Sequence, residues 1–234
     1  MKPDPGWLDA LPSHRLIAEM SLWSADLADI SGDIARIDAF TDIYHLDVAD
    51  GHFSPALLLF PDLAAAVRKR TSKPLHVHLM VSDAILGAQI AQFAEAGADL
   101  ISIHAESSDV AGAMALIDKQ GLPAGLVLQL HTPVSAVAPW LDRIRFMTLL
   151  GTRIGVKGQG HDAKAEARLA QARALLAARG SDRRVVLAAD GGIREHTVPG
   201  LRRAGAETIV MGSLAFNAAD LAARMQWVHA QRGV

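Results

Sequence analysis

The 234-residue chain contains no cysteine. It therefore has no disulfide framework, no thiolate nucleophile and no cysteine-bound zinc, and any metal ion must be held by His, Asp or Glu. An excess of charge of one sign is also missing, because 23 Lys and Arg stand against 25 Asp and Glu, with a sequence pI near 6.5. This balance argues against a nucleic-acid partner and against a polybasic membrane anchor.

Long hydrophobic runs are missing as well. No apolar stretch reaches the roughly 20 residues that span a bilayer, and residues 1–6 lack the apolar core of a signal peptide. We therefore expect no membrane partner and a cytoplasmic location. Half of the residues are hydrophobic, which is enough for one large core.

The sequence does show a regular alternation of short apolar runs and Ala-rich amphipathic stretches. Strands are predicted at 17–23, 43–48, 75–80, 100–104, 124–130, 145–150, 185–190 and 208–211. Helices are predicted at 62–70, 84–96, 109–120, 134–141, 163–179, 194–204 and 217–231. This order predicts an α/β fold, a single-domain TIM (β/α)8 barrel over residues 16–234, with residues 1–15 as an N-terminal extension. The alternative, a doubly wound sheet, would place a Gly-rich loop after the first strand, where Ser24-Ala25-Asp26 stands instead.

Two of the predicted strands carry polar side chains at alternating positions. Residues two apart share a face of a strand, so His45 and Asp47 point the same way, as do His76 and His78. Asp190 ends the seventh strand, and barrel active sites lie at the C-terminal strand ends. We therefore predict four ligands of one divalent metal ion (Zn, Fe, Mn or Co): His45, Asp47, His78 and Asp190. Singly, such a His is more often a core residue and such an Asp a helix cap, but four together favour the metal.

The two carboxylates of this set also form an acid–base pair. A divalent ion polarises the carbonyl of a ketose and stabilises the enediolate that forms when the adjacent carbon loses its proton. Asp47 and Asp190, on opposite sides of the substrate, could take a proton from one face and return one to the other. This is the chemistry of epimerisation, and it needs neither a nucleotide nor a flavin.

Glycines at the ends of the last three strands predict a phosphate site. Gly191-Gly192 follow the seventh strand and Gly212-Ser213 the eighth, where barrels often bind phosphate through backbone N–H groups. The Gly-rich connection 151–162 follows the sixth strand, and long loops in compact domains are usually functional. The alternative is that these glycines only allow tight turns with positive φ.

Together these segments resemble the ribulose-phosphate 3-epimerase family. The resemblance covers about residues 16–216 and rests on segments 21–26, 45–53, 77–81, 103–106, 190–192 and 212–213, in the family's order. It implies a metal-dependent isomerase that interconverts phosphorylated ketoses at C3, typically D-ribulose 5-phosphate and D-xylulose 5-phosphate. Family members are commonly dimers or hexamers, so a homo-oligomer is expected.

The resemblance also implies roles for the matching residues. His45, Asp47, His78 and Asp190 match the metal ligands, with Asp47 as proton acceptor and Asp190 as proton donor, the roles exchanging with reaction direction. The expected substrate-binding residues are Ser21, His78, Met80, Gly155, Val156, Lys157, Gly158, Gly191, Gly192, Gly212 and Ser213.

The chain departs from the family around this centre. The family's loop after the sixth strand usually reads Asn- or Asp-Pro-Gly-Phe-x-Gly-Gln, whereas residues 153–159 lack the proline and the aromatic and gain two cations. Ala49 and Leu150 stand where the family has methionine, so Met80 alone remains of the methionine cluster that shields the metal. A roomier or differently charged pocket follows.

A buried carboxylate also changes place. The family usually has Asp at the position of His76, Glu at that of Ala188 and a small residue at that of Glu19. Strands one, three and seven contribute to common layers of a barrel. We therefore predict that Glu19 pairs with His76 below the metal and orients its ligands.

Two other classes of function fit the same barrel. The first is a phosphosugar isomerase, aldolase or decarboxylase, but a Schiff-base aldolase needs a buried strand-end lysine and Lys157 lies in the long loop. The second is a non-catalytic phosphosugar-binding protein, which predicts the loss of an acid–base group. Asp47 and Asp190 are both present, which favours the epimerase.

Overall fold

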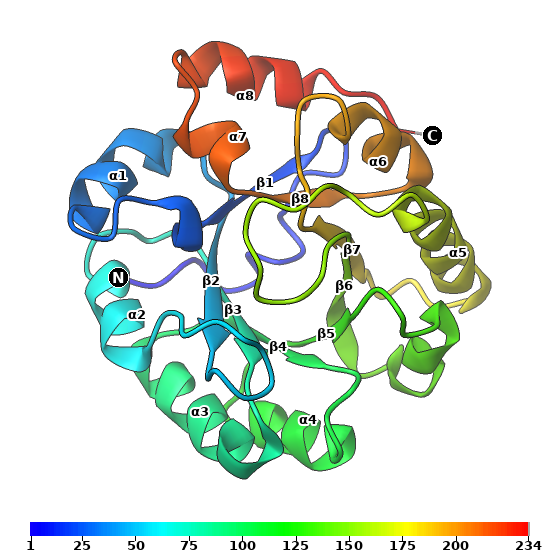
Figure 1. The fold of residues 1–234 in the computed structure, drawn as a ribbon. Coiled ribbons are helices and arrows are strands. Elements are labelled where there is room, and N and C mark those ends of the chain that lie inside the picture. Colours follow the sequence, from blue (N-terminus) through cyan, green and yellow to red (C-terminus); the bar gives the residue numbers. More distant parts are fainter. Residues whose placement is uncertain (234) are drawn as a thin grey trace.

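The computed structural model describes residues 1–233 and contains a closed barrel of eight parallel strands (Figure 1). Each strand pairs with the next along the chain, and the last pairs with the first. The predicted TIM (β/α)8 barrel is therefore confirmed. The strands are β1 (Ile17–Ser21), β2 (Ile43–Ala49), β3 (Leu75–Met80), β4 (Leu100–His104), β5 (Ala124–Leu128), β6 (Ile144–Leu150), β7 (Val186–Asp190) and β8 (Thr208–Met211).

Helices surround the barrel on its outer face (Figure 1). The α-helices are α1 (Ile30–Ile37), α2 (Pro61–Arg68), α3 (Asp83–Ala96), α4 (Val110–Lys119), α5 (Ala165–Ala178), α6 (Val198–Ala204), α7 (Ser213–Phe216) and α8 (Leu221–His229). Three short 3-10 helices complete the set: η1 (Leu22–Ser24), η2 (Asp38–Phe40) and η3 (Val134–Trp140). Within residues 1–233, no helix is long and apolar enough to cross a membrane.

Local sequence explains where several helices begin and end. The carboxylates of Asp29 and Asp109 accept hydrogen bonds from backbone N–H groups three residues on and so cap α1 and α4. Gly97 and Gly205 end α3 and α6 with φ of 103° and 117°, a left-handed conformation that favours glycine. The two Ala-Gly-Ala segments therefore stop the helices just before β4 and β8.

Three predicted elements differ from the structure, and one helix was not predicted. Helix α1 was not expected, because Ile30, Ile34 and Ile37 give only two short turns of apolar spacing. The predicted helix 134–141 is the 3-10 helix η3, since Pro139 lacks the N–H that an α-helix needs. The first strand ends at Ser21, and the final helix is divided into α7 and α8 by residues 217–220.

The barrel interior is layered. At the N-terminal end lies an apolar layer, made of Ile17, Ile43, Leu100, Phe146 and Val186. Above it lies a polar layer with no solvent exposure, made of Glu19, His45, His76, Ser102 and Thr208. The next inward positions, two residues further along each strand, reach the C-terminal mouth. The outward side chains pack under the helices in the main hydrophobic cluster.

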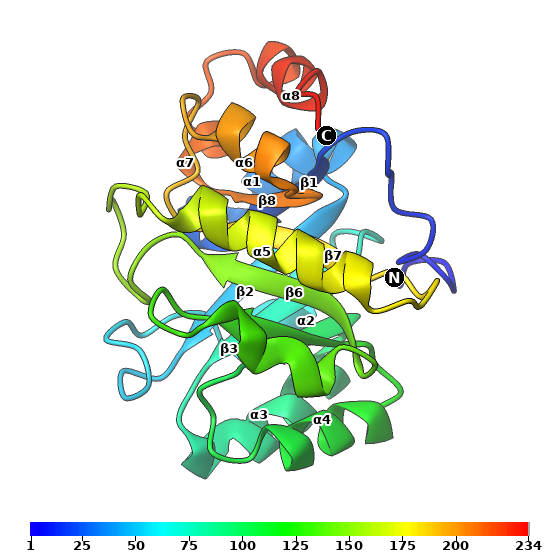
Figure 2. The same cartoon turned by 90° about the vertical axis from the view of Figure 1, so that its right-hand side faces the viewer.

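The N-terminal segment covers the opposite end of the barrel from the long loop after β6 (Figure 2). Leu8 and Leu11 are buried against the apolar interior layer, beside Phe146. Arg184 donates hydrogen bonds to the backbone oxygens of Leu11 and Pro12, at 2.7 and 3.1 Å. Residues 1–15 therefore close the bottom of the barrel, and the boundary at residue 16 stays a prediction.

Shortening the side chain of Leu8 tests how much residues 1–15 contribute to stability. Leu8→Ala is expected to lower the free energy of unfolding by about 2–5 kcal/mol, because it leaves a cavity against the interior layer. The measurement is urea unfolding followed by circular dichroism. Leu27→Ala is the matched control, because Leu27 is 59% exposed, and a change within about 0.5 kcal/mol is expected there. Equal effects of the two variants would contradict the packing of residues 1–15 against the barrel interior.

Candidate active site

A cavity of 490 Å³ opens at the C-terminal mouth of the barrel. It is bounded by strand ends and by residues 152–159 of the loop after β6, which Figure 1 shows across the centre of the barrel. All the predicted substrate-binding residues line it: Ser21, His78, Met80, Gly155, Val156, Lys157, Gly158, Gly191, Gly192, Gly212 and Ser213. The lining also includes residues that the sequence analysis did not single out, among them Thr152, Arg194 and Asn217.

The four predicted metal ligands lie together, and three of them, Asp47, His78 and Asp190, line this cavity. Each offers one nitrogen or oxygen atom, and these atoms all lie within 4.8 Å of one another: His45, Asp47, His78 and Asp190. Asp47 Oδ1 is 3.2 Å from His45 Nε2 and 3.3 Å from His78 Nδ1. The pairing register of β2 and β3 sets Asp47 beside His78, which explains this closeness.

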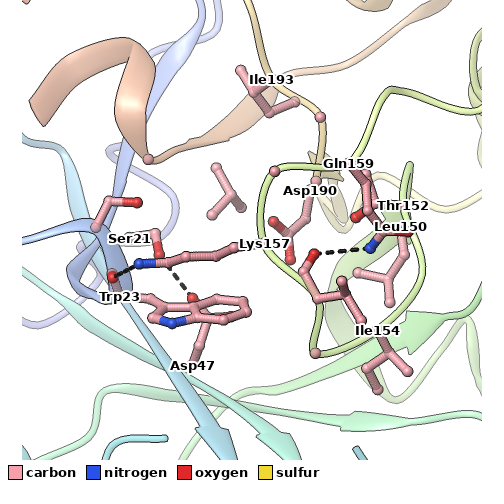
Figure 3. Close-up of a pocket in the computed structure, with 18 of the residues that line it drawn as sticks. Ser21, Trp23, Asp47, Leu150, Thr152, Ile154, Lys157, Gln159, Asp190 and Ile193 are labelled. Atoms are coloured by element: carbon pink, nitrogen blue, oxygen red, sulfur yellow. Dashed lines mark hydrogen bonds between the residues drawn. The ribbon is translucent and has the colours of Figure 1, made fainter. Parts of the chain in front are cut away.

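The two aspartates have opposite pKa shifts. Burial raises the pKa of Asp190 to about 6, and the charge of Asp47 adds to this effect. Burial also acts against ionisation of Asp47, but the imidazoles of His45 and His78 together outweigh it and lower the pKa of Asp47 well below its usual range. Ser21 Oγ donates a hydrogen bond of 2.7 Å to Asp47 Oδ2 (Figure 3). At neutral pH Asp47 is therefore the firmly ionised carboxylate of the pair.

The donor set fits a divalent cation. His78 Nδ1 is buried and has no hydrogen-bond partner, although it lies 3.8 Å from Asp190 Oδ2 as well as close to Asp47. A buried imidazole nitrogen facing two carboxylate oxygens is favourable when a cation lies among them. Two imidazoles and two carboxylates suit Zn, Fe, Mn or Co.

Comparison with known proteins places the chain in a family. The profile of the Ribulose-phosphate 3 epimerase family matches residues 17–216. Ribulose-phosphate 3-epimerase of Bacillus subtilis is 33% identical over 202 residues, which cover 86% of this chain and 92% of that protein. Ribulose-phosphate 3-epimerase 2 of Cupriavidus necator is 38% identical over 206 residues, covering 86% and 84% of the two chains. The chain belongs to the ribulose-phosphate 3-epimerase family. The predicted enzyme class, an isomerase of the epimerase type, is confirmed with it.

Two solved structures share the barrel at lower identity. 3-Hexulose-6-phosphate synthase aligns with a TM-score of 0.65 and 20% identity, over 93% of this chain and 97% of that chain. Orotidine 5'-phosphate decarboxylase from Pyrococcus horikoshii OT3 aligns with a TM-score of 0.65 and 12% identity, over 91% and 97%. At these identities the likeness shows the fold alone.

Within this epimerase-family barrel, Glu19 lies next to the candidate metal ligands on the side toward the N-terminal end of the strands. Its Oε1 lies 2.5 Å from His76 Nδ1 and 2.7 Å from His45 Nδ1. The predicted Glu19–His76 contact is therefore confirmed, and the contact with His45 is an addition. Burial opposes ionisation of Glu19, but the two imidazoles outweigh it and lower the pKa of Glu19 to about 2. An ionised Glu19 fixes the Nδ1–H of His45 and directs Nε2 toward Asp47.

The partners of this polar layer were missed in the sequence. Ser102 Oγ lies 2.6 Å from His76 Nε2, and Thr208 Oγ1 donates to Glu19 Oε2 at 3.2 Å. A Cβ on Gly125 would lie 2.0 Å from Ser102 Oγ, so the neighbouring strand leaves room for the hydroxyl. Ser102 stands two residues before His104, and this alternation was the available signal.

The loop after β6 is joined to the opposite wall of the cavity by Lys157. Its Nζ donates a hydrogen bond to the backbone oxygen of Trp23 and lies 5.1 Å from the centre of the indole ring (Figure 3). Burial lowers the pKa of Lys157, while the charge of Asp47 acts in the other direction. One of the two basic residues gained relative to the family therefore lines the cavity together with Asp47.

Proposed function

We propose that this protein catalyses the metal-dependent 3-epimerisation of a phosphorylated ketose, by proton transfer between two bases. The observation that carries this proposal is the pair Asp47 and Asp190, which project into one cavity from β2 and β7 with opposite pKa shifts. Environments that separate the pKa values of two neighbouring carboxyls are typical of an acid–base pair.

Four side chains would hold the divalent ion: His45, Asp47, His78 and Asp190. When bound, the ion polarises the ketose carbonyl and lowers the free energy of the enediolate. Asp47 takes the C3 proton on one face of the substrate, and Asp190 supplies a proton on the other. Ser21 holds Asp47 through its hydroxyl and so fixes the direction of the base. The reverse reaction exchanges the two roles.

The phosphate end of the substrate is assigned to the glycine-rich strand ends. Gly191 and Gly192 both have positive φ, of 86° and 69°, so the tight-turn interpretation holds for them. They nevertheless line the cavity with Gly212 and Ser213, where backbone N–H groups can reach phosphate oxygens. Lys157 adds a positive charge to the same cavity.

The substrate proposed first is the D-ribulose 5-phosphate and D-xylulose 5-phosphate pair, because the relatives above are named ribulose-phosphate 3-epimerases. A related ketose phosphate is the alternative, because Ala49 and Leu150 replace family methionines and residues 153–159 change the loop. Assay of tetrulose, pentulose and hexulose phosphates in D₂O, with Mn, Co, Zn and Fe, tests both. Deuterium entering at C3 supports the proposal, and carbon–carbon cleavage indicates an aldolase. If neither reaction occurs, the protein binds the sugar phosphate without turning it over. A homo-oligomer and a cytoplasmic location stay predictions.

Removal of the metal is the direct test of the cofactor. Dialysis against a chelator is expected to lower turnover by at least about 100-fold, because the carbonyl then loses its Lewis acid. Adding back one equivalent of a divalent ion is expected to restore activity, with metal content measured by elemental analysis. A magnesium-only add-back serves as the control, because imidazole ligands suit transition ions better. Full activity in metal-free protein would contradict the cofactor assignment.

A further inference from the structure

The cluster of candidate metal ligands is joined, through His78, to a row of hydrogen-bonded polar groups. His78 Nε2 lies 2.9 Å from His104 Nε2, and His104 Nδ1 lies 3.0 Å from Glu106 Oε2. Both imidazoles are 1% exposed, and their ring centres lie 5.1 Å apart with 27° between the ring planes. The row therefore runs from the metal cluster through His104 to one carboxylate.

The protons on this row can be assigned from the hydrogen-bond partners. Glu106 already accepts two hydrogen bonds on its other oxygen, from the backbone N–H of Gln129 and the hydroxyl of Thr132. An ionised carboxylate only accepts, so His104 must carry its proton on Nδ1. In a neutral His104, Nε2 is then unprotonated, so it can only accept a hydrogen bond, which comes from His78 Nε2–H. His78 is left with a bare Nδ1, the nitrogen that faces Asp47 and Asp190.

We propose that Glu106, acting through His104, is a positioning residue that holds His78 in its metal-binding tautomer. This proposal rests on the metal centre of the proposed function. Neither Glu106 nor His104 belongs to the four candidate ligands or to the residues that line the cavity. Glu106 sets the direction of two successive hydrogen bonds, and the result is a lone pair on His78 Nδ1 aimed at the cation site.

Replacing the carboxylate by an amide reverses this direction. In Glu106→Gln, the amide oxygen keeps the hydrogen bonds from Gln129 and Thr132, and the NH₂ group then faces His104 Nδ1 as a donor. His104 becomes protonated on Nε2 and donates to His78 Nε2. His78 must then carry its proton on Nδ1, where it blocks the metal. The substitution changes no ligand and nearly no volume.

The test measures zinc affinity and imidazole tautomers of the full-length protein. Zinc affinity is measured by competition with a chromogenic chelator at fixed pH. A loss of about 10–100-fold is expected in Glu106→Gln. Thr132→Val is the matched control, because it removes another partner of Glu106 and leaves the His104 contact in place, so zinc affinity within about twofold of wild type is expected. Long-range proton–nitrogen NMR of the zinc-loaded wild type is expected to show Nε2–H on His78 and Nδ1–H on His104.

The outcomes separate the relay from the metal centre. Wild-type protein that binds zinc, with Glu106→Gln binding it equally well, overturns the relay and leaves the metal centre standing. Wild-type protein that binds no zinc overturns the metal centre itself, and the relay with it. The NMR measurement on wild type decides even if a variant does not fold, because Nε2–H on His104 contradicts the proposed direction.

Discussion

Asp190→Asn is expected to lower kcat for ketose-phosphate epimerisation by about 10³-fold or more, because it removes the group that returns the proton. Asp47→Asn is expected to do the same, since each aspartate serves one face of the substrate. The measurement is a coupled steady-state assay with metal supplied in excess, because both residues are also predicted ligands. Asp62→Asn is the control, since Asp62 is exposed at the start of α2 and has no role in the proposed reaction.

Isotope exchange distinguishes a lost base from a lost metal. A variant that retains one base and its metal is expected to exchange the C3 hydrogen of one epimer with D₂O without forming the other epimer. The two variants are expected to favour opposite epimers. Exchange into neither epimer, with metal content at wild-type level, or undiminished turnover in either variant, would refute the two-base mechanism.

Glu19→Gln is expected to lower the free energy of unfolding by about 3–5 kcal/mol, the cost of removing one partner of a buried charged group. Glu19 is fully buried and joins His45, His76 and Thr208. Both imidazoles contact Oε1 and Thr208 contacts Oε2, so an amide oxygen can still accept from the imidazoles while the NH₂ group faces Thr208. What the substitution removes is the negative charge that strengthens both imidazole hydrogen bonds in a site without solvent. The measurement is urea unfolding of the metal-free protein, which excludes loss of bound metal as the cause.

Glu95→Gln is the matched control, because Glu95 is exposed on α3 and the same substitution is then made in contact with water. A change within about 0.5 kcal/mol is expected for it. If Glu19→Gln has an equally small effect, Glu19 is not the ionised centre of the polar layer.

The strand pattern made the barrel and its cluster of candidate metal ligands predictable. Period-two alternation sets His45 with Asp47 and His76 with His78, and the barrel geometry brings Asp190 to the same place. The Glu19–His76 pair was predictable because a carboxylate absent from two strands reappears on a third. In each case, alternation along a strand shows which side chains point into the barrel, and for Glu19 and His76 the resemblance to the family adds the missing carboxylate.

Other features depend on distances that no periodicity encodes. Nothing in the sequence indicates that Glu19 bridges two imidazoles, or that His104 lies against His78 rather than in the cavity lining. Lys157 was expected in the substrate loop, but its hydrogen bond to Trp23 depends on how that loop folds over the barrel. Helix α1 is short and carries a glycine, so its apolar spacing gives too weak a signal.

The closed N-terminal end of the barrel has a consequence for folding during synthesis. Leu11 leaves the ribosome long before Arg184, which donates a hydrogen bond to its backbone oxygen and follows 173 residues later. Closure of β1 against β8 waits equally long. Long-range contacts of this kind form late and slowly. During synthesis, Leu8 and Leu11 therefore remain uncovered until the barrel strands that follow them have emerged, which makes this segment a natural site for chaperone binding.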